Sequence, residues 1–485
     1  MTGATLLGID AGGTVIKAVL FDLDGRALAT GHARCPLAHP QPGFVERDPE
    51  QVWQACVTAI RGALADRPAD SITAVGITGH GDGGYLVDRH GRPTRAAITA
   101  SDGRAVANAA RLSTDRILQL SGTYPFPGSP PALLSWLAVH EPETLAATAA
   151  WLSCKDWLRL RLTGSVATDF SDASGAFLDI RTCSYSDELL ELYGLARWRS
   201  LLPALMRSDA IAGEVSPAAA QATGLAAGTP VVCGSHDCDA AAVGMGAVTP
   251  GMLSLIAGTF SINQVASDTA EVDPRWQTRV FLSPGRYLAM GTSPASASNL
   301  DWFVRTLGPA GERAFDEVNR EVAGVLGEPA GPVFLPFLYG APHGLDIGAG
   351  FLGVRAEHTR AHLLRAVFEG VVCNHRMHVA ALRETYRLTG TARLAGGGAR
   401  SPVWTQLFAD ALDMPVEVPA VAEAGALGAA VLAGLGTGLW PDLAAAVAAT
   451  TSIRATVAPD ADGVRRFDEI YRRYRHALDA VAALG

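Results

Sequence analysis

The feature that most restricts the fold of this chain is an arrangement that occurs twice: an apolar run, a glycine turn and a second apolar run. Near the N-terminus, residues 5–9 and 15–21 flank a turn at Gly12-Gly13. Near the middle, residues 252–257 lead into Gly258-Thr259 and continue into a further apolar stretch. Short apolar runs bounded by glycine turns predict β-strands joined by hairpins. The similarity of the two segments indicates a weak internal repeat, and we place a domain boundary near Gly246.

Further patterns predict an α/β protein. Helical periodicity covers residues 50–64, and apolar runs at 74–78, 85–87 and 230–234 read as strands. A small-residue helix is expected over 239–244, and another near the C-terminus over 425–434, where small side chains permit close approach of a backbone or a ligand. A chain of 485 residues exceeds what one hydrophobic core usually supports, so we expect domains at 1–245 and 246–485.

Charge and cysteine content exclude several classes of protein. The net charge of −9, from 39 Lys and Arg against 48 Asp and Glu, argues against a nucleic-acid partner, which requires clustered cations. The 7 cysteines have no CxxC spacing, which fits neither a disulfide framework nor a zinc site. Without a leader-like N-terminus or an 18-residue apolar span, we expect a cytoplasmic protein with no membrane partner.

Three glycine-rich loops are candidates for binding phosphate. Around Gly12, Gly13 and Thr14, backbone amides could face a phosphate while Asp10 reaches a metal ion, although an ordinary hairpin with a solvated Asp fits equally well. Gly258-Thr259 is a second such loop, or a plain turn. The third, residues 396–398, precedes a helix that Ser401 is expected to cap and Pro402 to open.

Two other segments carry polar groups at strand ends. Asp237 follows an apolar strand, where its carboxylate could accept a proton from an attacking hydroxyl. It could equally be a helix N-cap, a role for which Asp239 competes. Residues 79–84 match GxGxxG but run into a strand instead of a helix, which rejects a dinucleotide fold. His80 and Asp82 in that loop could instead bind hydroxyls.

Taken together, these segments resemble the FGGY family of carbohydrate kinases over residues 5–445. The most specific stretch is residues 396–406, followed by Ala409-Asp410, Glu423 and residues 426–430; residues 42–46, 162–164 and 223–237 also match. The resemblance implies an α/β fold of two actin-like (ribonuclease H-like) domains, with mixed sheets flanked by helices and a central cleft. The first domain would bind the sugar and the second the nucleotide.

The resemblance also implies roles for individual residues, with ATP and Mg²⁺ as cofactors. Asp237 matches the catalytic base, and Asp10 and Asp237 would hold the metal. The nucleotide would be bound by Gly12, Gly13, Thr14, Lys17, Gly258, Thr259, Gly397, Gly398, Ser401 and Gln406. The sugar would be bound by His80, Gly81, Asp82, Asp102, Arg104 and Asp237.

The expected function is ATP-dependent phosphorylation of a terminal hydroxyl of a small sugar. The sequence leaves open whether the chain forms a homodimer. Within the family, the chain resembles L-xylulose kinases and erythritol kinases, so we expect a ketopentose, with erythritol or another polyol as the alternative. Ala100 and Leu133 replace a Trp and a Lys that are common near the sugar, which leaves the exact substrate open. A non-catalytic sugar sensor of the same fold and an actin-like or chaperone ATPase are rivals from other classes.

Overall fold

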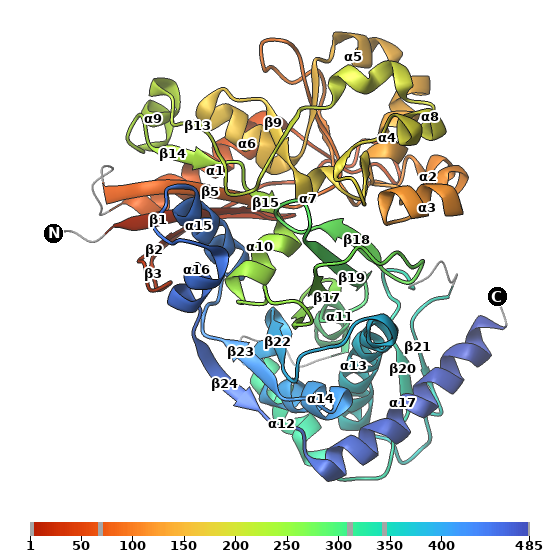
Figure 1. Ribbon diagram of the computed structural model, residues 1–485. Helices are drawn as coiled ribbons and strands as arrows, with labels where there is room; N and C mark the ends of the chain where they lie inside the picture. Colours follow the sequence, from red (N-terminus) through yellow and green to blue (C-terminus); the bar gives the residue numbers. More distant parts are fainter. Residues whose placement is uncertain (1–3, 66–70, 308–313, 342–346, 484–485) are drawn as a thin grey trace. The chain divides into compact units, whose positions relative to one another are not determined.

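The computed structural model describes residues 4–65, 71–307, 314–341 and 347–483, and the chain divides into two compact units (Figure 1). A single boundary after residue 245 does not reproduce these units, because two later segments group with the first. The first unit contains Met1–Val248, Ser267–Leu288 and Glu423–Thr451, and the second contains Thr249–Ala266, Ala289–Ala422 and Ser452–Gly485.

The first unit is built on a mixed sheet with the order β13-β14-β5-β1-β2-β3, in which β15 also pairs with β5. The glycine turn produces the expected hairpin: β1 and β2 are antiparallel, with Ala11 opposite Ile16, and β5 lies parallel to β1. The strands are β1 (Thr5–Ala11), β2 (Val15–Phe21), β3 (Ala27–Arg34), β5 (Ile72–Gly79), β13 (Ile211–Glu214), β14 (Pro230–Val232) and β15 (Ser235–His236).

One face of this sheet is covered by an apolar core. Successive side chains of a strand point to opposite faces, and the odd-numbered Leu7 and Ile9 of β1 pack in this core. Helices contributing to it are α1 (Pro49–Leu64), α6 (Cys154–Thr163) and α9 (Pro217–Thr223).

Helix α15 (Ala424–Gly436) covers the opposite face, and its backbone lies directly against the backbone of the strands. A Cβ atom added to Gly8 would lie 1.9 Å from the carbonyl oxygen of Ala426, and one added to Gly76 would lie 1.8 Å from that of Ala429. Helix α10 (Asp237–Gly244) approaches α15 equally closely at Gly428. The close backbone approach expected from the small residues of this helix is therefore confirmed, and it explains why Glu423–Thr451 belongs to the first unit.

The rest of the first unit forms a separate apolar core of short helices and two-stranded ladders. The helices are α2 (Val106–Leu112), α3 (Asp115–Ser121), α4 (Pro130–His140), α5 (Pro142–Ala147), α7 (Phe170–Ala173), α8 (Asp187–Tyr193), η2 (Ala196–Leu201) and, beside α15, α16 (Leu443–Thr450). The strands of these ladders are β4 (Glu46–Arg47), β6 (Tyr85–Val87), β7 (Ala97–Ile98), β8 (Ala150–Leu152), β9 (Ala167–Asp169), β10 (Leu178–Asp179), β11 (Ser184–Tyr185) and β12 (Ala204–Met206).

The second sheet repeats the strand order of the first: it runs β18-β19-β17-β16-β22-β23-β24, with β18 (Gln277–Val280) added at the β19 edge. As in the first unit, a hairpin (β16 and β17) is followed by parallel strands (β22 and β23) and a final antiparallel strand, so the internal repeat is confirmed. The strands are β16 (Leu253–Ala257), β17 (Ser261–Ser267), β19 (Tyr287–Ser293), β22 (Ala392–Ala395), β23 (Val416–Pro419) and β24 (Ile453–Val457), with a small ladder of β20 (Val333–Leu335) and β21 (Gly350–Leu352).

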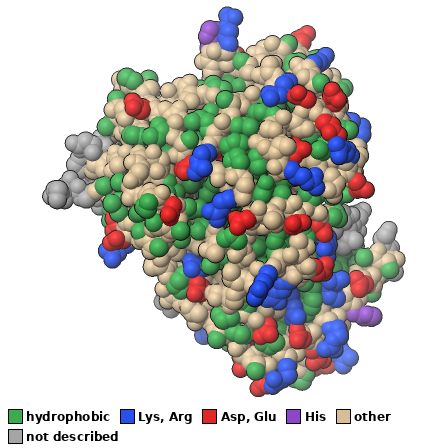
Figure 2. Space-filling view, viewed as in Figure 1, with side chains coloured by type: hydrophobic (Ala, Val, Ile, Leu, Met, Phe, Trp, Pro, Cys, Tyr) green, Lys and Arg blue, Asp and Glu red, His purple; other side chains and the backbone are tan. Residues whose placement is uncertain are grey.

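Helices accompany this second sheet and complete its α/β architecture. They are α11 (Ser298–Leu307), α12 (Ala314–Val325), α13 (Arg360–Thr385), η4 (Gly397–Arg400), α14 (Pro402–Leu412) and α17 (Ala461–Ala482). Within the described parts of the chain, no helix is both long and apolar enough to cross a bilayer. On the face shown in Figure 2, acidic and basic side chains are intermixed, and neither sign gathers into a stripe.

Candidate active site

Asp10 lies near the end of β1, beside the N-terminus of α15. A Cβ atom added to Gly425 would lie 2.6 Å from Oδ2 of Asp10, so a side chain at this position would displace the carboxylate. Lys17, on β2, donates to Oε2 of Glu423 at 2.7 Å. The structure therefore places a carboxylate, an ion pair and a helix N-terminus around the first glycine turn, where Gly13 and Thr14 are exposed.

The electrostatic surroundings of Asp10 favour a cation. Burial, reinforced by the negative charge of Asp237 and opposed by Lys17, raises the pKa of Asp10 from 3.8 to about 7. Two carboxylates that repel each other in this way are stabilised by a shared positive ion. Carboxylate oxygens are also the ligands that Mg²⁺ prefers.

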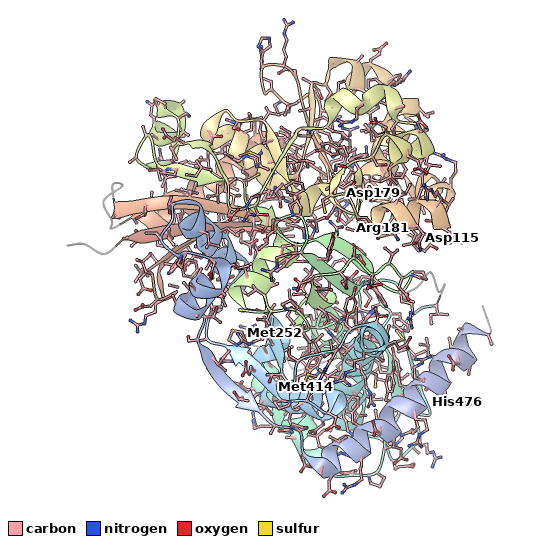
Figure 3. The ribbon with its side chains drawn as sticks, in the orientation of Figure 1. Asp115, Asp179, Arg181, Met252, Met414 and His476 are labelled. Carbon is pink, nitrogen blue, oxygen red and sulfur yellow. The ribbon has the colours of Figure 1, made fainter. Side chains whose placement is uncertain are left out.

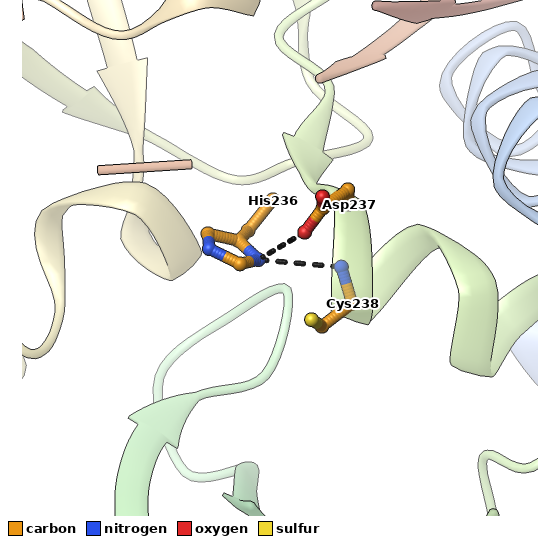
Figure 4. A group of neighbouring side chains, drawn as sticks. All are labelled: His236, Asp237 and Cys238. Atoms are coloured by element: carbon orange, nitrogen blue, oxygen red, sulfur yellow. Dashed lines mark hydrogen bonds and ion pairs between the residues drawn. The ribbon is translucent and has the colours of Figure 1, made fainter. Parts of the chain in front are cut away.

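Asp237 opens helix α10, and His236 precedes it as the N-cap (Figure 4). Nδ1 of His236 lies 3.0 Å from Oδ1 of Asp237 and 3.2 Å from the backbone nitrogen of Cys238. The expectation that Asp237 or Asp239 caps this helix is wrong, because the helix begins two residues before 239 and His236 takes the cap. The Asp237 side chain remains 40% exposed, while His236 is 7% exposed.

Opposing effects set the protonation of this pair. Burial alone would lower the pKa of His236, but the carboxylate of Asp237 raises it well above 6.5. Conversely, burial would raise the pKa of Asp237, but the charge of His236 lowers it below 3.8. At neutral pH, Asp237 is therefore an ionised carboxylate.

His236, Asp237 and Cys238 also have potential metal-ligand atoms within 4.8 Å of one another. Their proximity follows from their being consecutive in the chain. Burial raises the pKa of the Cys238 thiol to about 12, so the sulfur is protonated at neutral pH and is a poor ligand. The proximity of these three groups is therefore by itself no evidence of a transition-metal centre.

The glycine loop after β5 places His80, Gly81 and Asp82 next to this pair. Oδ2 of Asp82 lies 3.9 Å from Nε2 of His236 and accepts from Nη2 of Arg279 at 3.0 Å. Burial and the charge of Arg47, whose Nη1 is 3.2 Å from the ring, lower the pKa of His80 to about 4, so its imidazole is neutral. The three residues expected near the sugar thus lie close to Asp237 within the first unit.

Asp102 and Arg104 are engaged with other parts of the first unit. The buried Asp102 carboxylate accepts from the Val45 amide at 2.6 Å and from Nε of Arg104 at 2.8 Å. Arg104 also binds Glu46 at 2.7 Å, and its guanidinium stacks over Phe44. These contacts hold both side chains within the first unit, and their sugar-binding role stays a prediction.

In the second unit, two of the expected nucleotide loops lie side by side. Gly258-Thr259 follows β16, and Gly396-Gly397-Gly398 follows the parallel β22, so both loops leave the same edge of the sheet. Cβ atoms at Gly396 and Gly398 would each lie 2.7 Å from atoms of Ala257, which explains both glycines. Met252 precedes β16, and Met414 precedes β23, which is parallel to β22; both therefore mark the opposite edge of the sheet (Figure 3).

Ser401 and Gln406 form hydrogen bonds within the second unit. The hydroxyl of Ser401 accepts from the Trp404 amide at 3.1 Å, which confirms the expected cap, and donates to Asn319. Nε2 of Gln406 donates to Asp410 at 2.8 Å and to the Ala458 carbonyl at 3.1 Å. Nucleotide binding by these two side chains remains a prediction.

Sequence reasoning missed two residues of the site. His236 was overlooked although it adjoins Asp237, because its role depends on which residue begins the helix. Arg279 lies 197 positions from its partner Asp82, and no local pattern connects them. Only the folded first unit brings this arginine to the loop after β5.

Comparison with known proteins identifies the family. Residues 5–244 match the N-terminal domain model and residues 253–437 the C-terminal domain model of the FGGY family of carbohydrate kinases. The chain is 35% identical to the L-xylulose/3-keto-L-gulonate kinase of Escherichia coli (strain K12), over 98% of this chain and 97% of the relative. It is 31% identical to the erythritol kinase of Brucella abortus (strain 2308), over 99% and 97% of the two chains.

Solved structures agree with this assignment. The crystal structure of xylulose kinase from Rhodospirillum rubrum superimposes with a TM-score of 0.90 at 30% identity, covering 99% of each chain. The two actin-like domains expected from the resemblance are thereby confirmed. The chain belongs to the FGGY family of carbohydrate kinases and is a carbohydrate kinase.

Proposed function

We propose that the chain transfers the γ-phosphoryl group of ATP to a terminal hydroxyl of a ketopentose of the xylulose type, in the cytoplasm. The observation that carries this proposal is the ionised, partly exposed carboxylate of Asp237 at the start of α10. Phosphoryl transfer needs positioning and charge stabilisation more than covalent chemistry. In this proposal, Asp237 accepts the proton of the sugar hydroxyl as the new P–O bond forms.

The nucleotide side of the proposal rests on the second unit. FGGY sugar kinases use ATP as phosphate donor, generally with a divalent metal. A Cβ atom added to Gly258 or Gly397 would meet one neighbouring atom only, at 3.8 Å and 4.0 Å respectively, and Thr259 is exposed. Backbone amides in such turns form a concavity suited to phosphate oxygens.

Mg²⁺ fits the acidic groups of the first unit. Asp10 and Asp237 would hold it, because their mutual repulsion raises the pKa of Asp10 when no cation is present. Bound there, the ion would neutralise charge on the phosphate oxygens during transfer. Lys17 is paired with Glu423, so a contact of its ammonium with phosphate would require that pair to open.

The substrate is proposed from the relatives. The relatives at 35% and 33% identity are named as an L-xylulose/3-keto-L-gulonate kinase and a probable L-xylulose kinase, which supports a ketopentose as the substrate. The erythritol kinase at 31% identity supports a polyol as the second candidate. Hydroxyl patterns differ between these substrates, and a site built for one hydroxyl pattern discriminates against another.

The test is Mg²⁺-dependent ADP release measured with L- and D-xylulose, xylitol, erythritol and glycerol. Wild type is compared with Asp237→Asn, which we expect to lower kcat by about 10²–10⁴-fold because a general base is lost. Asp115→Asn is the matched control: this surface carboxylate at the start of α3 (Figure 3) binds only Tyr124 among the contacts described, and should leave kcat unchanged.

Each result has a definite meaning. The proposal is supported if wild type and Asp115→Asn phosphorylate xylulose and Asp237→Asn does not. If erythritol is the one substrate that is phosphorylated, the second candidate is correct. Unchanged kcat in Asp237→Asn would refute the role of Asp237. ATP hydrolysis that no sugar stimulates would favour an ATPase, and sugar binding without turnover would favour a sensor.

A further inference from the structure

His236 lies between two carboxylates of the first unit, and its ring is held in one position. Its Nδ1 is 3.0 Å from Oδ1 of Asp237, and its Nε2 is 3.9 Å from Oδ2 of Asp82. A Cβ atom on Gly81 would lie 1.9 Å from Cδ2 of the ring, so the imidazole packs directly against the backbone of the glycine loop. Substitution of that glycine would move the ring.

Two contacts compete for Nδ1 of His236: without a proton it accepts from the Cys238 amide at 3.2 Å, and with a proton it donates to Oδ1 of Asp237 at the shorter distance of 3.0 Å. An unprotonated Nδ1 and a carboxylate oxygen are both acceptors, and two acceptors 3.0 Å apart repel each other. With a proton on Nδ1, the same contact is a charge-assisted hydrogen bond, which is among the stronger polar contacts in proteins. The donor restricts rotation of a carboxylate that is otherwise 40% exposed.

The other nitrogen of the ring faces an anchored carboxylate. Asp82 has a positive φ of 58°, a strained conformation for a residue with a side chain. Nη2 of Arg279 donates to both of its oxygens, at 3.2 and 3.0 Å, and the Arg279 side chain is 2% exposed. Arg279 therefore fixes Asp82, whose carboxylate attracts the imidazole electrostatically from 3.9 Å, beyond hydrogen-bond distance.

We propose that His236 is a positioning residue that orients the Asp237 carboxylate toward the sugar hydroxyl, with Asp82 and Arg279 holding the imidazole in place. The proposal rests on the function proposed above, in which Asp237 is the general base. The arrangement carboxylate–imidazole–carboxylate resembles the logic of catalytic triads, in which the remote acid orients the ring. Here, the oriented group is itself a carboxylate.

The proposal assigns Asp82 a role that differs from direct sugar binding. A positioning residue changes the fraction of productive geometry in the bound complex, so its loss lowers kcat. A residue that binds substrate and transition state equally changes KM when it is lost. Kinetics of variants at His236 and Asp82 therefore separate the two roles.

The test compares His236→Ala, which removes the donor, with His236→Asn, whose amide N–H can replace Nδ1–H. We expect His236→Ala to lower kcat about 10–100-fold, a range typical of small misplacements of a reacting group, with the KM for the sugar within about threefold of wild type. His236→Asn should recover at least fivefold of that loss. Asp82→Asn should also lower kcat without raising KM.

A double-mutant cycle provides the control. In the Asp237→Asn background, His236→Ala should cause no further loss, because the group that it positions is already gone. Multiplicative losses, or wild-type kcat in His236→Ala, would overturn the proposal. A raised KM with unchanged kcat in Asp82→Asn would remove Asp82 from it and return that residue to sugar binding.

A readout independent of activity distinguishes this inference from the proposed function. In crystal structures, the Asp237 carboxylate should keep one orientation in wild type and His236→Asn and should rotate or split in His236→Ala. If wild type phosphorylates no sugar, the proposed function fails, and these structures still decide whether His236 orients Asp237. An unmoved carboxylate in His236→Ala would refute the positioning role, whereas unfolding of that variant shifts the comparison to His236→Asn and Asp82→Asn.

Discussion

Gly76→Ala tests the backbone contact between α15 and the first sheet. The new methyl group would lie 1.8 Å from the carbonyl oxygen of Ala429, whereas carbon and oxygen normally approach to roughly 3.3 Å. Helix and sheet would therefore have to separate by about 1.5 Å. Because the helix is held at Gly8 and Gly428 by contacts of the same kind, it cannot move at one point alone.

The magnitude follows from two opposing effects. Overpacking a well-packed core costs about 1–3 kcal/mol, and a contact between two backbones places this site at the upper end. Replacing glycine by alanine reduces the entropy of the unfolded chain, which stabilises by only about 0.4–1 kcal/mol. The steric effect wins, and we expect a net loss of about 2 kcal/mol in the free energy of unfolding.

Urea denaturation and calorimetry measure this loss, which corresponds to a fall in Tm of roughly 2–3 °C, because the unfolding entropy of about 2.1 cal/mol/K per residue is large for a chain of this size. Gly13→Ala is the matched control, because a Cβ atom there meets nothing within 4 Å. Its stability should stay within about 0.5 kcal/mol of wild type. If Gly76→Ala were as stable as this control, the argument that glycine is required for helix–sheet contact would be refuted.

Three further predictions concern the site. Gly425→Ala places a methyl group 2.6 Å from Oδ2 of Asp10, a movable side-chain atom, so kinase assays should show at least about a tenfold lower kcat while Tm changes little. Burial would raise the pKa of Asp82, but its arginine partner and His236 lower it to about 2. A carboxylate with a lowered pKa stabilises the fold fully only above its ordinary pKa of 3.8. The loss of stability in Asp82→Asn, measured by urea denaturation, should therefore be constant above about pH 5. It should shrink as the pH falls through 3.8 toward 2. Lys17→Met and Glu423→Gln should each cost less than about 1 kcal/mol of stability; a raised KM for ATP in Lys17→Met alone would mean that the ammonium also binds phosphate.

Local patterns predicted much of the fold. Glycine turns and apolar runs identified β1, β2, β5 and β16, because hairpin geometry depends on a few neighbouring residues. The cap at Ser401 was predicted for the same reason. The start of α10 was not, because it depends on tertiary pairing: His236 pairs with Gly79 of β5, and the helix begins directly after it.

The partners of the charged residues could not be derived from the sequence. Asp102 and Arg104 are predicted to bind the sugar, which stays untested, and the sequence did not indicate that the two buried side chains would also bind each other. The pair of Asp82 and Arg279 joins residues that are remote in sequence, and composition gives no reason to prefer that arginine. The small residues of α15 indicated close approach, but not which strands it would cover.

The late position of α15 in the sequence has a consequence for synthesis of the protein. Strands β1 and β5 are complete once Gly79 has been made, while the helix that covers them begins at Ala424. At about 5–20 residues per second, the ribosome needs on the order of 20–70 s to bridge that interval. Throughout this time the glycine-lined face of the nascent sheet lacks its cover, so the first unit matures only near the end of translation, and chaperone binding to nascent chains should peak before Gly436 emerges.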